Sequence, residues 1–174
     1  MIKPINPFPG GILIRDQADI EAIARGNWSL ASDGPAWRSG YRRYGAAKLC
    51  AMMMVHELQD RMSRDASLGN ICVLAVDPGY MSTGLQRYAP WLVRVLISIL
   101  FPLGAWLIPG GPIRIPDTSA RHVLRAAFES DGGMVEFPKG LYFDGDKLES
   151  TSDESRDAHK RDMVWKASDP AEIV

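Results

Sequence analysis

The longest regular pattern of apolar positions in this chain lies between residues 41 and 64, and its period is that of an α-helix. The positions that recur at intervals of three and four residues are Tyr44, Lys48, Met52, Val55, Leu58 and Met62. This spacing places them along one helical face and predicts a helix over residues 41–64, followed by a turn over residues 65–70. The run Met52-Met53-Met54 fits core filling better than a cofactor contact.

A second pattern, at residues 71–76, is a continuous apolar run of the kind found in strands that are covered on both faces. It predicts a parallel sheet flanked by helices, with a loop over residues 77–86 in which a ligand could meet the end of the strand. Residues 140–144 are predicted to form a second short strand, which Gly145 terminates. Two strands are few for an independent sheet.

Two shorter helices are predicted on either side of the first strand. The helix over residues 16–25 turns Ile20 and Ile23 inward and stops at Gly26. The helix over residues 118–129 is predicted to be capped by Asp117. Its inner side is predicted to hold Val123, Leu124 and Phe128.

A third helix is predicted near the C-terminus. Thr151 and Glu154 form a capping-box pattern, from which the helix runs to about residue 167 and packs Met163 and Trp165.

The N-terminal part of the chain is predicted to be mostly irregular. Three prolines make residues 1–11 a loop, residues 11–14 are a candidate short strand, and residues 27–40 form a loop anchored by Trp28 and Trp37. The remaining order of helix, strand, helix, strand and helix predicts an α/β fold, the back half of a doubly wound parallel sheet. We therefore expect one partial domain over residues 1–174, with an irregular segment at 1–40.

Composition places the chain among ordinary globular proteins, with 46% hydrophobic and 24% charged residues. A net charge of −1 gives no sign of nucleic-acid binding. The three histidines, His56, His122 and His159, are scattered, so no metal site is expected. Cys50 and Cys72 fit buried, reduced thiols, and no signal peptide is visible, which favours a cytoplasmic location.

The segment over residues 90–109 is unusually apolar and nearly long enough to span a bilayer. Arg94 and the sequence Pro102-Leu103-Gly104 argue against a clean span. Three interpretations stay open, in falling order: an apolar lid over a substrate, an interfacial membrane contact, and a transmembrane helix.

The candidate chemistry lies at Tyr44 and Lys48. Residues four apart on a helix point the same way, one turn above the other. An ammonium group beside a phenol favours the phenolate and pulls its pKa toward working pH. Such a phenol can give a proton to a carbonyl oxygen or take one from an alcohol. Taken one at a time, both residues fit ordinary surface side chains of a helix better than catalytic ones.

Tyr44 and Lys48, together with Pro78-Gly79 and Thr83, resemble the C-terminal half of a short-chain dehydrogenase/reductase. The stretch at residues 42–50 and the run at 71–76 are most similar to a fungal, retinol-dehydrogenase-like branch. The resemblance covers about residues 27–165 and implies a Rossmann-type fold and an NAD(P)-dependent oxidoreductase.

By this resemblance, Tyr44 would be the general acid/base, and Lys48 would lower the pKa of the phenol and hold the nicotinamide ribose. Pro78, Gly79 and Met81 would line the nicotinamide, and Thr83 would hydrogen-bond it. The cofactor would be NAD or NADP, and the substrate a small lipophilic carbonyl or alcohol.

The glycine-rich turn that holds a dinucleotide pyrophosphate does not occur in this sequence. Ser32, upstream of Tyr44, fits a solvated loop residue better than the catalytic serine of the family. The alternative is therefore an inactive fragment or pseudoenzyme that binds another protein through an open sheet edge. An unpaired strand and the apolar segment at 90–109 would also favour self-association.

Overall fold

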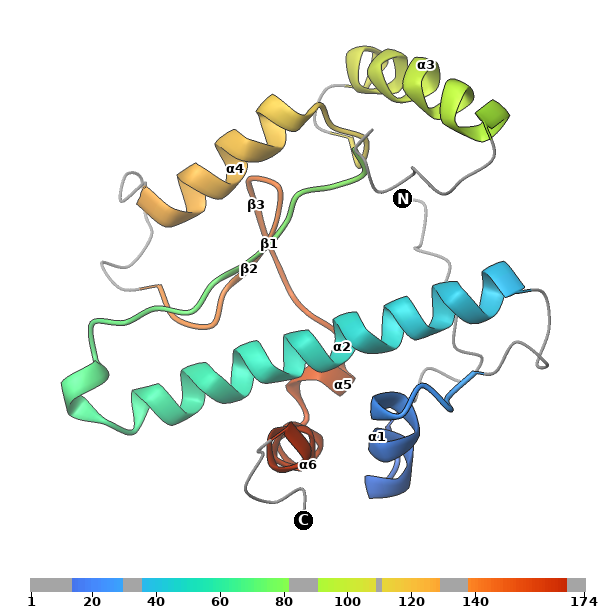
Figure 1. The fold of residues 1–174 in the computed structure, drawn as a ribbon. Helices are drawn as coiled ribbons and strands as arrows, with labels where there is room; N and C mark the ends of the chain where they lie inside the picture. The colour runs from blue at the N-terminus through green and yellow to red at the C-terminus, as the bar shows by residue number, and fades with distance from the viewer. Residues whose placement is uncertain (1–13, 30–35, 82–90, 109–110, 129–137, 169–174) are drawn as a thin grey trace. The chain divides into compact units, whose positions relative to one another are not determined.

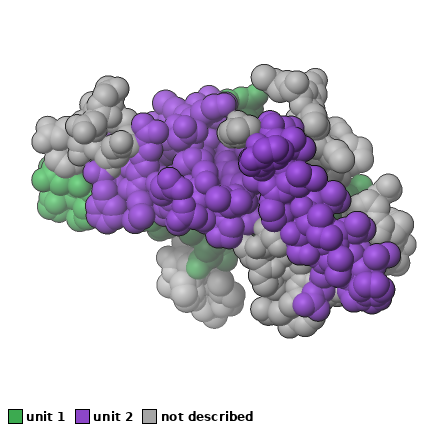
Figure 2. Space-filling view, turned by 90° about the horizontal axis from the view of Figure 1, so that it is seen from above, with its two compact units in different colours: residues 1–73, 151–174 green, residues 74–150 purple. Residues whose placement is uncertain are grey.

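The computed structural model describes residues 14–29, 36–81, 91–108, 111–128 and 138–168 (Figure 1). The chain separates into two compact units (Figure 2). One unit contains residues 1–73 and 151–174, and the other contains residues 74–150. In its described part the first unit is built from helices, whereas the second contains the sheet.

Helix α1 (Gln17–Ala24) confirms the helix predicted at residues 16–25. The Asp16 side chain caps it by accepting a hydrogen bond from the Asp19 amide. Gly26 ends it with a φ of +70°, while the Asn27 amide reaches back to the Ala22 carbonyl oxygen at 2.8 Å, as in a Schellman motif. The predicted loop at 1–11 and most of the candidate strand at 11–14 lie outside the described residues.

Helix α2 (Ala36–Ser63) confirms the long predicted helix but begins five residues before residue 41. Figure 1 shows α1, α5 (Asp153–Arg156) and α6 (Ala158–Ser168) along one side of it. The buried side of α2 is not the predicted stripe. Ala46 and Met53 are fully buried, whereas Tyr44 and Leu58 are exposed. These two buried residues pack with Ile14, Ile20 and Val164 in the core of the first unit.

The predicted capping box at Thr151 and Glu154 is wrong, because the helix starts one residue later. Ser152 is the cap of α5 and accepts a hydrogen bond from the Ser155 amide. The Thr151 hydroxyl instead lies 2.9 Å from Nε2 of His56.

Glu154 has a tertiary role in place of the predicted capping one. Its carboxylate accepts from the Ile14 amide at 2.9 Å and from Nζ of Lys160 at 3.0 Å. The predicted single helix also breaks at Asp157, which separates α5 from α6. Trp165 lies under Arg61, whose Cζ is 4.7 Å from the ring centroid, so its predicted packing is confirmed.

The strand predicted at residues 71–76 is much shorter in the structure, where β1 is Ala75–Asp77. The preceding backbone is engaged elsewhere. The Ile71 amide donates to the Leu68 carbonyl oxygen after the short turn η2 (Ala66–Leu68), and the Val73 amide donates to Oε1 of Gln59 at 2.7 Å. The prediction of cover on both faces is also wrong, because Ile71 is exposed.

Among its described residues, the second unit has a sheet of three strands in the order β1-β2-β3. Strand β2 (Tyr142–Asp144) confirms the predicted strand at residues 140–144 and pairs in parallel with β1, Val76 facing Phe143. Strand β3 (Lys147–Glu149) was not predicted and pairs antiparallel with β2. The structure is therefore mixed α/β with one parallel strand pair.

Helix α4 (Pro116–Phe128) confirms the helix predicted at residues 118–129 apart from its ends, but two details of that prediction are wrong. Asp117 is not the cap, since Pro116 already occupies the first helical position. The predicted inner residues Val123, Leu124 and Phe128 are exposed. The buried position is Ser119, because a sheet with strands this short covers only the face of α4 that meets β1.

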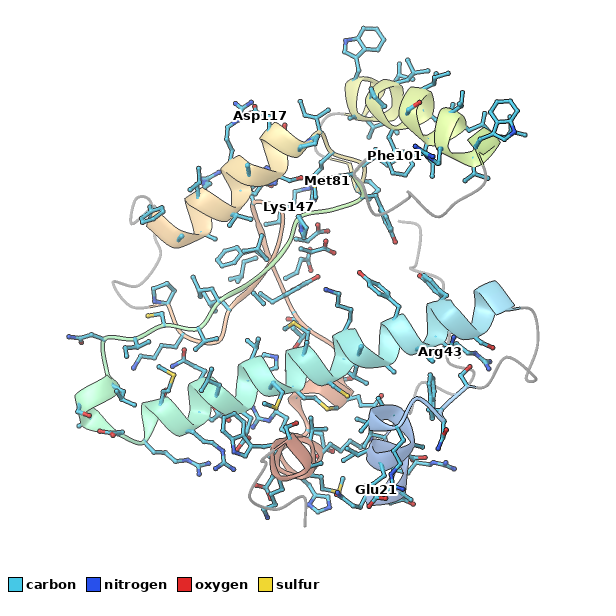
Figure 3. All side chains as sticks on the ribbon, viewed as in Figure 1. Glu21, Arg43, Met81, Phe101, Asp117 and Lys147 are labelled. Atoms are coloured by element: carbon cyan, nitrogen blue, oxygen red, sulfur yellow. The ribbon has the colours of Figure 1, made fainter. Side chains whose placement is uncertain are left out.

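Helix α3 (Trp91–Leu107) occupies most of the apolar segment and continues through Pro102. Its large apolar side chains stand out from it in Figure 3, where Phe101 is labelled. Most of them are exposed, including Trp91 and Trp106 near its two ends. Within the described residues, no helix combines the length and hydropathy that a membrane span requires.

Candidate active site

The first part of the candidate site is the exposed face of α2. Nζ of Lys48 lies 5.6 Å from the centroid of the Tyr44 ring, within the range of a cation–π contact. Tyr44 is 56% exposed. The two residues are one turn apart, as their spacing predicted.

The opposite face of α2 fixes the direction of this pair. Ala46, which lies between Tyr44 and Lys48 in the sequence, is fully buried on the core side of the helix. Farther along α2, the buried carboxylate of Glu57 accepts from Nε of Arg61 at 2.8 Å. Arg61 also reaches Asp162 on α6 at 3.2 Å. Apolar packing and ion pairs thus hold the helix with Tyr44 and Lys48 outward.

The second part of the candidate site is the turn at Pro78-Gly79, where β1 ends. Asp77 organises this turn through both its carboxylate and its backbone. Oδ1 of Asp77 accepts from the Gly79 amide at 2.8 Å, and its carbonyl oxygen accepts from the Gly145 amide at 3.0 Å. Gly79 has a φ of +78°, a conformation that strongly favours glycine.

Neighbouring segments hold the same turn from two sides. The Ser119 hydroxyl on α4 donates to the Pro78 carbonyl oxygen at 2.6 Å. The Tyr80 amide donates to the Pro112 carbonyl oxygen at 2.7 Å, and the Arg114 amide donates to the Tyr80 carbonyl oxygen at 2.9 Å. The backbone of the turn is therefore held by hydrogen bonds and is not a free loop.

The electrostatic surroundings of the turn are acidic on the sheet side. Burial, and then the charges of Asp77 and Asp144, raise the pKa of Tyr142 to about 12. Tyr142 is therefore a neutral phenol at physiological pH.

Two known proteins are similar to this chain over most of its length. The short-chain dehydrogenase iccH of Talaromyces variabilis is 41% identical over 150 residues, which are 83% of this chain and 41% of that protein. The short-chain dehydrogenase/reductase dpmpH of Macrophomina phaseolina (strain MS6) is 28% identical over 144 residues, 79% of this chain and 64% of that protein.

The chain belongs to the short-chain dehydrogenase/reductase family. It spans less than two thirds of the length of both of these short-chain dehydrogenases. Both organisms are fungi, in agreement with the fungal resemblance of the sequence. No protein-family model matches the chain, and no solved structure gives a significant match.

The residues expected from the short-chain dehydrogenase pattern fall in both units. Tyr44 and Lys48 belong to the first unit, and Pro78, Gly79 and Met81 to the second. Met81, labelled in Figure 3, is partly buried just beyond the turn. Thr83, the fourth member of the predicted nicotinamide set, lies outside the described residues, as does Ser32.

Sequence reasoning missed two residues of this chain that hold the turn, Ser119 and Arg114. Neither lies in a regular apolar pattern, so no local signal marked them. The β2–β3 hairpin, in contrast, had a signal in Gly145-Asp146. A two-residue loop with glycine first is typical of a type II′ hairpin turn.

The predictions about metals and thiols concern other parts of the chain. Within the described ranges, no group of His, Cys, Asp or Glu side chains could hold a metal ion. Cys50 and Cys72 are free thiols as predicted, although both are only partly buried.

Proposed function

We propose that this chain supplies the catalytic helix and the nicotinamide-side turn of an NAD(P)-dependent oxidoreductase of the short-chain dehydrogenase/reductase type. The reaction would transfer a hydride between the nicotinamide and a carbonyl or alcohol. The observation that carries the proposal is the pairing of Tyr44 and Lys48 on the exposed face of α2 in a member of this family.

In this proposal Tyr44 is the general acid/base. Its exposed hydroxyl would give a proton to the carbonyl oxygen during reduction and take it back during oxidation. Lys48, with its ammonium group next to the ring, would favour the ionised phenol electrostatically and hold the nicotinamide ribose by hydrogen bonds.

The residues of this chain fit the nicotinamide end of the cofactor better than the phosphate end. The turn at Pro78-Gly79 is fixed by hydrogen bonds and exposes Tyr80 beside it, so it offers a preformed edge to a flat ring. Pro78, Gly79, Met81 and Thr83 would line that ring. The sequence contains no glycine-rich turn between a strand and a helix, so no residue is assigned to the pyrophosphate. When bound, NADH or NADPH would supply the hydride for reduction of a carbonyl, and NAD or NADP in its oxidised form would accept it from an alcohol. The doubly wound Rossmann-type sheet is part of this proposal.

The substrate in this proposal is a small lipophilic carbonyl or alcohol. The apolar side chains of α3 support this, since they are too exposed to serve only as core. In this family the corresponding segment covers the substrate, and an apolar lid would suit an apolar molecule.

A second candidate function is a protein-binding module without catalysis. Strand β1 has no neighbour on its outer edge among the described strands, because the order is β1-β2-β3. Such an edge can pair with a strand of another chain. If this second function is right, substitution of Tyr44 should not change the affinity of the chain for its partner protein.

The test is the dinucleotide-dependent turnover of lipophilic aldehydes and ketones, measured with the chain alone and with any longer protein that contains it. With the longer protein we expect Tyr44→Phe to lower turnover by roughly 10²–10⁴-fold while cofactor affinity stays nearly intact, because only the proton donor is lost. Tyr41→Phe, an exposed tyrosine one turn earlier on α2, is the matched control and should keep full activity. A Tyr44→Phe protein with most of its activity would refute the assignment.

Lys48→Met tests the second role. It should weaken both cofactor binding and turnover and move the pH profile upward, because the phenol loses its cationic neighbour. The chain alone should bind neither NADH nor NADPH at micromolar concentration in a fluorescence titration. Micromolar binding would show that a phosphate site exists that the sequence pattern does not reveal.

A further inference from the structure

Arg114 is a buried cation of the second unit. It is 7% exposed and lies in the segment that connects α3 to α4. Its Nη1 donates to the Asp77 carbonyl oxygen at 3.1 Å, and its Nη2 donates to Oδ1 of Asp144 at 2.7 Å. These two acceptors are the last residues of β1 and β2. One side chain therefore ties together the ends of two parallel strands.

The guanidinium group passes between two glycines. A Cβ on Gly79 would lie 2.9 Å from Nη1 of Arg114, and a Cβ on Gly145 would lie 2.8 Å from its Cζ and Nη2. Both glycines also have positive φ values, of +78° and +66°. The turn after β1 and the hairpin after β2 thus approach the same side chain so closely that neither leaves room for a methyl group.

An apolar residue could fill this position without the same hydrogen bonds. Burying a charge is a weak source of stability, especially since the partner Asp144 has a half-exposed side chain. Nε of Arg114 is also buried without a hydrogen-bond partner in the described part of the chain. Arginine differs from other residues in its geometry. Its planar guanidinium group donates to two acceptors at fixed angles, which the ammonium group of lysine cannot do.

We propose that Arg114 is a positioning residue that locks the Pro78-Gly79 turn against the β2–β3 hairpin and so fixes the backbone edge that would receive the nicotinamide. The link to the nicotinamide rests on the proposed function, whereas the lock itself does not. The lock is supported by two hydrogen bonds to one atom, since the Asp77 carbonyl oxygen accepts from both Nη1 of Arg114 and the Gly145 amide.

The experiment is residue-resolved amide hydrogen exchange on the full chain, with Arg114→Met as the test variant. Methionine has a similar length, so it can fill the slot but donates nothing. The reporters are the amides of Gly79, Tyr80 and Gly145, each of which is hydrogen-bonded in the structure. We expect their exchange to accelerate at least tenfold, while amides of α2 in the other unit stay unchanged.

Two further variants separate positioning from general stability. Arg121→Met removes an exposed arginine that pairs with Asp117 on α4 and should leave the three reporters unchanged. Arg114→Lys keeps the charge and loses the fork, so it should accelerate exchange by an intermediate factor. Unchanged reporters in Arg114→Met, or an equal acceleration over all of residues 74–150, would overturn the lock.

A kinetic measurement on a longer, active protein tests the link to the cofactor. Arg114→Met should raise KM for the dinucleotide more than it lowers kcat. Faster exchange without a change in KM would overturn the link while the lock stands. Failure of the proposed function would give a different result. Activity would then survive the Tyr44→Phe substitution, while the amides of Gly79, Tyr80 and Gly145 would still exchange faster in Arg114→Met.

Discussion

Replacing Gly79 by alanine tests whether the turn after β1 is as tightly enclosed as the structure indicates. Two separate costs arise. The backbone cost comes from a φ of +78°, where an L-residue is less stable by about 1–2 kcal/mol. The steric cost comes from a Cβ that would lie 2.7 Å from the Pro112 carbonyl oxygen and 2.9 Å from Nη1 of Arg114. Overpacking of this kind typically costs about 1–3 kcal/mol.

Gly26 offers a matched control, because its φ of +70° is nearly the same but a Cβ would meet nothing within 4 Å. Gly26→Ala should therefore show the backbone cost alone, about 1–2 kcal/mol. Gly79→Ala should lower the free energy of unfolding by roughly 2–5 kcal/mol, the sum of both costs.

The assay is urea unfolding followed by far-ultraviolet circular dichroism, with both variants and the parent chain at one temperature. The informative quantity is the difference between the two variants, since the shared backbone cost cancels. If Gly79→Ala and Gly26→Ala lose the same stability within about 0.5 kcal/mol, the close approach of Arg114 and Pro112 is wrong.

Four other outcomes follow from named features of the first unit and of α3. Gly40→Ala should stabilise the chain by about 0.5–1 kcal/mol in the same urea assay, because Gly40 lies inside α2 and a Cβ there meets nothing within 4 Å. Burial, helped by Arg161, lowers the pKa of His56, so the unfolded chain binds the extra proton first. Stability should therefore fall as the pH drops through about 6.5 toward the lower folded pKa, and His56→Gln should remove that slope. Burial raises the pKa of Cys50, so its reaction with a thiol reagent should be slower in the folded chain than in urea. Size-exclusion chromatography with light scattering should show self-association through the exposed apolar surface of α3, and a monodisperse monomer would contradict it.

The positions of the helices could be predicted from the sequence because their signals are local. Gly26 marked the end of α1, and the spacing of Tyr44 and Lys48 placed both on α2. Element boundaries were less accurate where two capping signals compete, as at Thr151 and Ser152. The neighbouring Ser152 wins, because its hydroxyl accepts from Ser155 while Thr151 binds His56.

Which face of a helix is buried could not be predicted, because that depends on what lies beside it. The apolar residues Leu124 and Phe128 on α4 suggested an inner face, yet both are exposed. The small, polar Ser119 is buried instead, since its hydroxyl satisfies the Pro78 carbonyl oxygen where α4 meets β1. A buried hydroxyl whose hydrogen-bond partner is distant in the sequence does not show up in the spacing of apolar residues.

The same contrast separates the two parts of the candidate site. The pair of Tyr44 and Lys48 is readable because four residues along one helix are enough to bring a phenol and an ammonium group together. The turn at Gly79 is different, since the side chain packed against it is that of Arg114, 35 positions later in the printed sequence. The two acceptors of Arg114 are at the ends of β1 and β2, which pair with each other, so this contact depends on segments far apart in the sequence. Under the proposed function, the pair that would transfer the proton therefore lies on one helix, whereas the turn that would receive the nicotinamide depends on contacts between separate segments. Substitutions in this chain should divide accordingly: those at Tyr44 should change chemistry with little effect on folding, and those at Arg114 should change local order first.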